Sequence, residues 1–203
     1  ITEDFLVEIK KGTMMLTATN LETSISTRMA VDSKEDGALA VPAKILLETL
    51  KALPNQLVTF DVDLEQRSLV LTTETGMYKM AVDPPDDFPA LPASDDKEIL
   101  FPVERLLNGI NYTIFATTSD EMRPAMTGVN VVVDFNKITF VASDGHKLVR
   151  FHALGTSTEQ TGSFVVPKKA MALLKNASPS DGNVYLKYNK SHVFFRFEDT
   201  QVI

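Results

Sequence analysis

The feature that most constrains this chain is an internal repeat with a spacing of about 125 residues. Residues 16–20 (LTATN) match residues 140–144 (FVASD) at an offset of 124, and residues 41–51 (VPAKILLETLK) match the segment that starts at Val166 (VPKKAMALLK) at an offset of 125. Two strand-like segments follow in both halves. Matching signals in one order at nearly constant spacing indicate one structural unit used twice. The sequence therefore predicts two homologous domains.

A proline-rich segment separates the two halves. Residues 83–96 contain four prolines and five acidic residues, which disfavour regular structure and suit an extended connector. We therefore place the boundary near Ser94, with domains over 1–94 and 95–203. The second half has a helix-like segment at 102–115 that the first lacks, and it ends where its last strand should begin. We expect a first domain without its N-terminal helix and a second domain truncated in its last strand.

Alternating apolar residues predict strands, and their short polar turns predict mostly antiparallel sheets. The segments that follow Pro42 and Pro167 instead show helical spacing, with Pro in the first turn. Each of these helices combines an apolar stripe for its sheet with a lysine-bearing outer face. The predicted fold class is α+β. The strand segments with the clearest alternation are residues 5–9, 58–62, 131–135 and 164–166.

The charge balance limits the kind of nucleic-acid binding that this chain can perform. Its net charge is −7, and phosphate contacts need Lys and Arg. Residues 1–94 hold 8 basic and 15 acidic side chains, whereas residues 95–203 hold 12 of each. Any basic surface must therefore be local. The absence of cysteine excludes disulfides and thiolate metal sites, and we expect a soluble, cytoplasmic protein.

No arrangement of residues predicts catalysis. The three histidines are scattered, and the chain has no HExxH motif, no Ser-His-Asp arrangement and no glycine-rich phosphate loop. No His, Asp and Glu cluster has metal-ligand spacing. We therefore expect a protein that is not an enzyme and that has no cofactor or metal.

Several short segments resemble one family. Residues 141–149 (VASDGHKLV) resemble the (T/S)DG(H/Y)(R/K)L signature of the bacterial DNA polymerase III beta subunit, the sliding clamp. The two Val-Pro-(Ala/Lys)-Lys helix starts, residues 87–91 (DFPAL) and residues 123–129 (RPAMTGV) also resemble that family, in the expected order. The resemblance covers essentially the whole chain.

The resemblance implies a subunit of three similar domains, two copies of which close head-to-tail into a homodimeric ring around duplex DNA. Sheets form the outside of such a ring, and helices line its concave inner face. The chain would hold most of the first two domains, with the third absent. The resemblance further implies that the protein is a processivity subunit. Its implied partners are duplex DNA of any sequence, the DNA polymerase III catalytic subunit, the clamp loader, repair polymerases and other clamp-binding proteins.

The resemblance also implies three groups of site residues. The side chains expected to face DNA are Lys44, Lys51, Arg105, Arg123, Lys168, Lys169 and Lys175. The expected partner-peptide groove contains Met126, Ser143, Gly145, His146, Lys147 and Leu148. Tyr78 and Met80 are candidates for the dimer interface, although their strand could equally be an interior one. The alternative function is a β-rich protein-interaction module without a nucleic-acid role, in which the lysines would be scattered over the outside.

Overall fold

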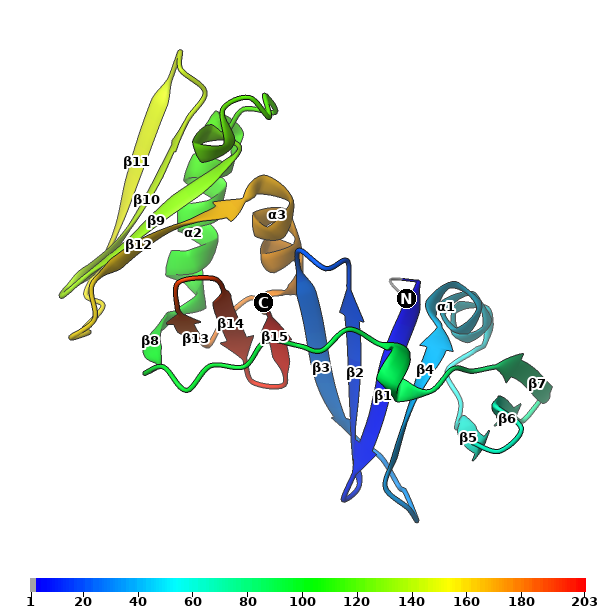
Figure 1. The fold of residues 1–203 in the computed structure, drawn as a ribbon. Coiled ribbons are helices and arrows are strands. Elements are labelled where there is room, and N and C mark those ends of the chain that lie inside the picture. Colours follow the sequence, from blue (N-terminus) through cyan, green and yellow to red (C-terminus); the bar gives the residue numbers. More distant parts are fainter. Residues whose placement is uncertain (1–2) are drawn as a thin grey trace. The chain divides into compact units, whose positions relative to one another are not determined.

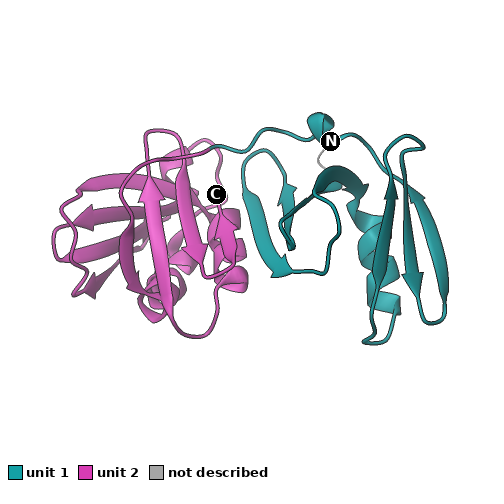
Figure 2. Ribbon diagram, turned by 90° about the horizontal axis from the view of Figure 1, so that it is seen from below, with its two compact units in different colours: residues 1–92 teal, residues 93–203 magenta. Residues whose placement is uncertain are grey.

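The structure is a computed structural model of the protein and describes residues 3–203. The chain divides into two compact units, unit 1 (Ile1–Pro92) and unit 2 (Ala93–Ile203), which Figure 2 shows in different colours. The division falls inside the proline-rich segment. Among the residues described, no helix has the length and apolar character needed to cross a membrane.

The first sheet of unit 1 is antiparallel, with the strand order β4-β1-β2-β3 (Figure 1). Val7 pairs with both Leu16 and Leu39, so these three apolar side chains share one face. Lys11 and Gly12 join the first two strands and both have positive φ, at 50° and 74°, as a two-residue hairpin turn requires. The strands are β1 (Asp4–Lys10), β2 (Thr13–Thr19), β3 (Ser24–Ala30) and β4 (Gly37–Pro42).

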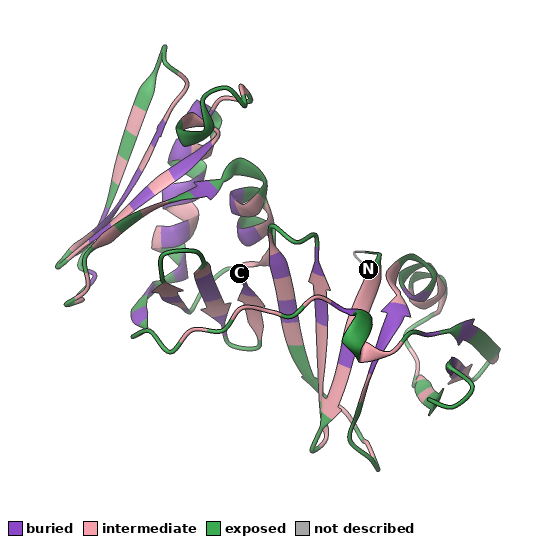
Figure 3. Cartoon of the chain, in the orientation of Figure 1, coloured by how far each residue is buried: buried purple, intermediate pink, exposed green. Residues whose placement is uncertain are grey.

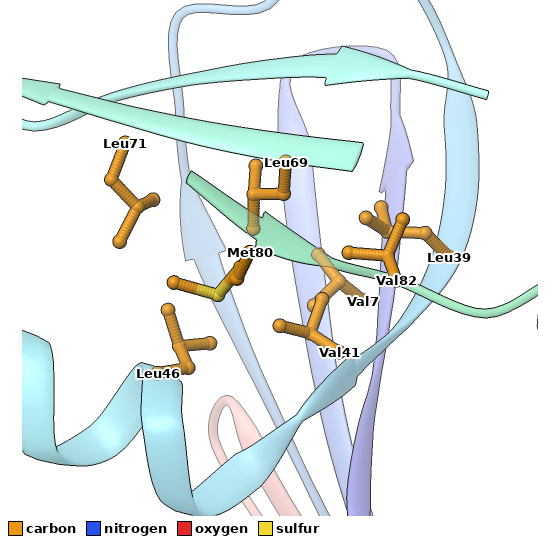
Figure 4. Packing of buried hydrophobic residues seen from close by; sticks show 8 residues of the cluster. All are labelled: Val7, Leu39, Val41, Leu46, Leu69, Leu71, Met80 and Val82. Carbon is orange, nitrogen blue, oxygen red and sulfur yellow. The ribbon is translucent and has the colours of Figure 1, made fainter. Parts of the chain in front are cut away.

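A helix and a smaller sheet cover part of this face. Helix α1 (Ala43–Ala52) follows β4, and the smaller sheet has the order β5-β6-β7. Figure 4 shows the resulting core, in which Leu46 of α1 approaches side chains of both sheets. The strands are β5 (Thr59–Asp63), β6 (Ser68–Thr73) and β7 (Gly76–Ala81). The buried core residues are Val7, Leu39, Val41, Leu46, Leu69, Leu71, Met80 and Val82.

Unit 2 repeats this arrangement. Its four-stranded sheet has the order β11-β10-β9-β12, and helix α3 (Lys168–Ala177) follows β12 as α1 follows β4. A second antiparallel sheet pairs β8 with β13, β13 with β14, and β14 with the short β15. The predicted α+β class with antiparallel sheets is confirmed. The strands are β8 (Ile99–Pro102), β9 (Gly128–Asp134), β10 (Lys137–Ser143), β11 (Leu148–Leu154), β12 (Gly162–Pro167), β13 (Asn183–Tyr188), β14 (Val193–Phe197) and β15 (Thr200–Val202).

Unit 2 also contains three successive elements that have no counterpart in residues 3–92. Strand β8 leads into helix α2 (Val103–Thr113), and the 3-10 turn η2 (Ile114–Ala116) extends that helix. Helix α2 and η2 together account for the helix predicted at residues 102–115. Leu106 and Ile110 lie on the buried side of α2 at helical spacing, and both are fully buried. Helix α2 packs on β10 and β11.

We predict that Gly128→Ala destabilises unit 2. A Cβ atom at Gly128 would lie 2.3 Å from the carbonyl oxygen of Val166 in the paired strand β12. Because both partners are backbone, the strands must separate, which we expect to cost about 1–3 kcal/mol. The measurement is the free energy of unfolding from urea denaturation followed by circular dichroism.

Gly37→Ala is the matched control, since nothing lies within 4 Å of its added Cβ. We expect the free energy of unfolding of this control to stay within about 0.5 kcal/mol of the parent value. Equal stability of Gly128→Ala and the parent chain would contradict the close pairing of β9 and β12.

Candidate functional site

The helices that follow the two Val-Pro segments carry exposed lysines. On α1 and α3, the apolar stripe packs on the sheet and leaves the charged side chains in solvent. Three of these lysines lie in the first helical turn, where the helix dipole disfavours cations and favours anions. Neither helix has an acidic residue in that turn. The exposed lysines are Lys44, Lys51, Lys168, Lys169 and Lys175, and none of them forms an ion pair within residues 3–203.

Arg105 does not match the expectation of a side chain that faces phosphate. It is half-buried on α2, and its Nη1 atom is buried without a hydrogen-bond partner in the part of the chain described. A Cβ atom on Gly155, just after β11, would lie 3.0 Å from this nitrogen. The guanidinium therefore lies against the loop after β11, and the structure does not support Arg105 as a freely exposed phosphate contact.

The Asp-Gly-His-Lys segment forms the tight turn between β10 and β11. The side chain of Asp144 accepts hydrogen bonds from the backbone N–H groups of His146 and Lys147, at 3.0 and 2.9 Å, and forms an ion pair with the Lys147 ammonium. Ser143 accepts from the N–H of Gly145 at 3.2 Å and donates to the carbonyl of Lys147 at 2.9 Å. Gly145 has φ +90°, a conformation that favours glycine. The motif is thus a self-braced turn.

The same contacts keep Asp144 charged. The Lys147 ammonium, together with the backbone N–H groups of Lys147 and His146, holds the pKa of the Asp144 carboxyl well below its usual range. Burial acts weakly in the opposite direction. Because the charged form is the one that binds these donors, the turn keeps its conformation across neutral and mildly acidic pH.

The turn lies at the same end of its sheet as the short helix η3 (Pro124–Met126). Val141 pairs with Asn130, so Ser143 at the end of β10 lies level with Gly128 at the start of β9, next to η3. This register brings Met126 to the end of the sheet that carries the turn. Met126 is partly buried, whereas Leu148, the first residue of β11, is 71% exposed. The expected groove residues therefore come from one end of the unit 2 sheet.

Arg123 joins this cluster, which the sequence did not indicate. Its Nη1 atom would lie 3.1 Å from a Cβ atom on Gly145, and its Nε atom forms an ion pair with Asp120 at 3.0 Å. The family resemblance places Arg123 only among the DNA-facing residues. Arg123 lies 22 residues before Gly145 in the sequence. Their contact depends on the packing of η3 beside the turn, which the sequence pattern does not specify.

The two candidate interface residues have different environments. Strand β7 lies at an edge of its sheet, but Met80 is 6% exposed and belongs to the core of unit 1. Its pairing with the fully buried Leu69 places it on the inner face. The structure therefore does not support the Met80 side chain as an interface contact. Tyr78 is 39% exposed. Met77, on the opposite face of β7, is 76% exposed, but the sequence did not predict it as an interface residue.

We predict that Asp144 titrates below the range of an ordinary aspartate, whose pKa is about 3.9. A lowered folded-state pKa means that the stabilising contacts are fully present above the unfolded-state pKa and are lost as the pH falls through the folded-state value. Carbon-13 NMR of the Asp144 carboxyl should show no titration midpoint near pH 3.9. Lys147→Met removes the ammonium and should move the midpoint upward. A normal midpoint in the parent chain would contradict the bracing of the turn.

Comparisons with known proteins agree with this geometry. Residues 1–92 match the family model described as "DNA polymerase III beta subunit, N-terminal domain", and residues 100–203 match "DNA polymerase III beta subunit, central domain". The chain is 30% identical to the beta sliding clamp of Synechococcus elongatus over 194 residues, covering 92% of this chain and 51% of the relative. It is 28% identical to the beta sliding clamp of Synechocystis sp., covering 95% of this chain and 54% of the relative.

Solved structures show the same fold. The sliding clamp of Bacillus subtilis superposes with a TM-score of 0.93 at 21% identity, over 99% of this chain and 56% of that one. A beta subunit from Eubacterium rectale superposes with a TM-score of 0.91 at 25% identity, over 99% of this chain and 56% of that one. The chain thus spans about half the length of the proteins that it matches. It belongs to the DNA polymerase III beta subunit family, the sliding clamps, and contains the N-terminal and central domains of that family.

Proposed function

We propose that this chain forms part of a DNA sliding clamp that encircles duplex DNA and tethers the replicative polymerase during processive synthesis. Its family is non-catalytic. The observation that carries the proposal is the group of exposed lysines on α1 and α3, two helices that follow corresponding strands of the two units. These lysines have no acidic partner in residues 3–203, and within the repeat Lys44 aligns directly with Lys169. A repeated lysine-bearing helix is the local basic surface that an acidic protein needs in order to hold a phosphate backbone.

Contacts to the phosphate backbone suit a protein that must slide. Backbone contacts carry no sequence information, whereas contacts to base edges would hold the clamp at particular sites. Lysine also presents a mobile point charge rather than the fixed fork of arginine, so it favours loose attraction over bidentate recognition. We propose Lys44, Lys51, Lys168, Lys169 and Lys175 as the DNA-facing residues, with Arg123 at the end of the unit 2 sheet as a further candidate.

The second part of the proposal concerns partner proteins. We propose that Met126, Leu148 and the braced turn form part of a groove that binds peptides of the polymerase III catalytic subunit, the clamp loader and repair polymerases. The partly buried Met126 and the exposed Leu148 offer an adaptable apolar surface. Gly145 allows close backbone approach, and the charged Asp144–Lys147 pair keeps the turn in one conformation before binding.

The proposal also includes assembly of the full-length protein into a homodimeric ring. A homodimeric ring needs a third domain in each subunit, and the first domain of one subunit meets the third domain of the other. Tyr78 and the backbone of the edge strand β7 are the candidates for that contact. The 203-residue chain should therefore not close a ring by itself. The proposed location is the cytoplasm, where chromosomal DNA is replicated in bacteria.

The lysine surface is tested by charge reversal. Lys168→Glu combined with Lys169→Glu should weaken binding of the chain to a duplex oligonucleotide by roughly tenfold at low salt. The slope of the logarithm of the binding constant against the logarithm of the salt concentration should fall by about two, since each phosphate contact contributes about 0.9. Fluorescence anisotropy with a labelled duplex measures both quantities.

The control carries the same change of charge elsewhere in unit 2. Lys97→Glu with Lys190→Glu alters two exposed lysines outside the helices and should leave DNA affinity within about twofold of the parent value. Equal losses in both double variants would indicate a general effect of net charge. That result would favour a protein-interaction module without a DNA role.

The groove is tested on β11. Leu148→Glu should reduce the affinity for a clamp-binding peptide of the polymerase III catalytic subunit by more than about tenfold, because a charge replaces an apolar contact. Leu154→Glu is the matched control, since Leu154 is 63% exposed at the other end of the same strand. Fluorescence polarisation with a labelled peptide measures the affinities. Unchanged binding by Leu148→Glu, with intact folding, would exclude this residue from the groove.

A further inference from the structure

A cluster of charged and aromatic side chains lies on the second sheet of unit 2, on the face that points away from the core. Buried and partly exposed residues alternate over the middle of β13, and Tyr185 and Lys187 are the partly exposed ones (Figure 3). Strand register places Leu100 of β8 and Arg196 of β14 directly opposite Tyr185, one on each side. The three side chains therefore form a row across the sheet.

Two contacts hold the Arg196 side chain in one orientation. Its Nη2 atom donates to both carboxylate oxygens of Glu98, at 2.9 and 3.0 Å, and its guanidinium carbon lies 3.9 Å from the centre of the Tyr185 ring. A planar cation over an aromatic face is attracted to the ring in addition to the carboxylate. Within residues 3–203, the Nε and Nη1 atoms of Arg196 form no hydrogen bond. The guanidinium is therefore fixed in place while two of its nitrogens stay available to a ligand.

The cluster holds more positive than negative charge. The Nζ atom of Lys187 lies 3.6 Å from the same Glu98 carboxylate, so two cations share one anion. The hydrogen bond from Arg196 lowers the pKa of the Glu98 carboxyl, which is therefore charged at neutral pH. The side chains of these three residues are 27–35% exposed. One uncompensated positive charge thus remains at a surface that solvent reaches.

The corresponding sheet of unit 1 has no such cluster. The repeat aligns the segment VTFD of unit 1 with the segment VYLK of unit 2, so Thr59 corresponds to Tyr185. Thr59 pairs with Thr72 across β5 and β6, as Tyr185 pairs with Arg196 across β13 and β14. The same fold therefore forms in unit 1 with neither the cation nor the aromatic ring at these positions. Because folding does not require the Arg196 and Tyr185 pair, recognition of a partner accounts for it better.

We propose that this face of unit 2 binds an acidic segment of a partner protein. A carboxylate of the segment accepts hydrogen bonds from the Arg196 nitrogens that Glu98 leaves unoccupied, and such charge-assisted bonds are stronger than neutral ones. An apolar side chain of the segment packs on Leu100, which is 48% exposed. Arginine and tyrosine are enriched among the residues that dominate binding energy at interfaces. This inference does not depend on DNA binding or on the groove at the other sheet of unit 2.

The width of the row sets the spacing of the segment. Leu100 and Arg196 lie two strands apart, a separation of about 10 Å. In a polyproline-type chain, which has three residues per turn, side chains three residues apart lie on one side and are separated by about 9 Å. The segment that fits therefore has an acidic and an apolar residue with two residues between them.

A phosphate backbone fits this face less well than a peptide. Glu98 lies inside the cluster and repels phosphate, and sequence-independent binding of nucleic acid needs several cations rather than one uncompensated charge. Leu100 also offers an apolar contact, for which a phosphate backbone has no counterpart. Charge and polarity together favour a peptide with a single carboxylate.

The test uses the isotope-labelled 203-residue chain and short peptides that carry Glu-Pro-Pro-Leu between neutral Gly and Ser residues. NMR titration measures the dissociation constant and identifies the signals that shift. We expect shifts of Leu100, Tyr185 and Arg196, with a dissociation constant of about 1 mM. Replacing the peptide Glu by Gln, or its Leu by Ser, should weaken binding by roughly fivefold, since each change removes one of the two contacts.

Two variants of the chain change the cluster in opposite directions. Arg196→Met removes the cation and should weaken binding of the Glu-Pro-Pro-Leu peptide by about tenfold. Glu98→Gln removes the competing carboxylate but keeps an acceptor for Arg196, and should tighten binding by roughly threefold. Tighter binding would not follow if the ion pair only fastened the start of β8. Arg150→Met is the matched control, because Arg150 is an exposed arginine on β11 of the other sheet, and it should bind as the parent does.

Circular dichroism checks that each variant is folded, and the Glu98→Gln result decides the question if Arg196→Met does not fold. Equal binding by Arg196→Met and the parent, weaker binding by Glu98→Gln, or shifts confined to other residues would overturn the proposal. The absence of binding at millimolar peptide would also overturn it. If a duplex oligonucleotide shifted the same signals and the peptide did not, the face would bind nucleic acid instead.

Discussion

The constraint on which the rest of this structure depends is that each antiparallel sheet has one apolar face that must be covered. In unit 1 the core is a single cluster that contains Leu46 of α1, Val41 of the larger sheet and Leu69 of the smaller one. Once the apolar stripe of a helix is fixed on a sheet, its opposite side must face solvent. The exposed positions of Lys44 and Lys51 on α1, and of Lys168 and Lys169 on α3, follow from this packing.

The same constraint reconciles an acidic composition with a proposed role on DNA. The net charge of −7 describes the whole chain, whereas attraction to phosphate depends on charges within about one Debye length, roughly 8–10 Å. Lysines grouped at helix N-termini, with no acidic residue in the first turn, create a local positive potential. Duplication of the unit repeats this positive potential on a second helix, so the proposed attraction to phosphate has a source in each unit.

The braced turn at residues 144–147 shows a second use of the sheet framework. The hairpin between β10 and β11 requires a tight reversal, and Asp144 stabilises it through two backbone N–H groups and Lys147. The sheet register then places Met126 at the same end, and packing of η3 places Arg123 against Gly145. The strands of the unit 2 sheet thus hold side chains from distant parts of the chain at the end of the sheet where the groove is proposed.

The sequence by itself determined the duplication, the helices after Pro42, Pro102 and Pro167, and the Asp-Gly turn, because repeats, apolar periodicity and turn chemistry are local. It did not predict strands β3 and β11, whose alternation is obscured by polar residues such as Ser26, Arg150 and His152. Only the tertiary structure decided that Met80 is buried, that Arg105 is half-buried beside Gly155, and that Arg123 reaches the turn. These outcomes depend on strand register and on contacts between distant segments, which periodicity along a single element does not specify.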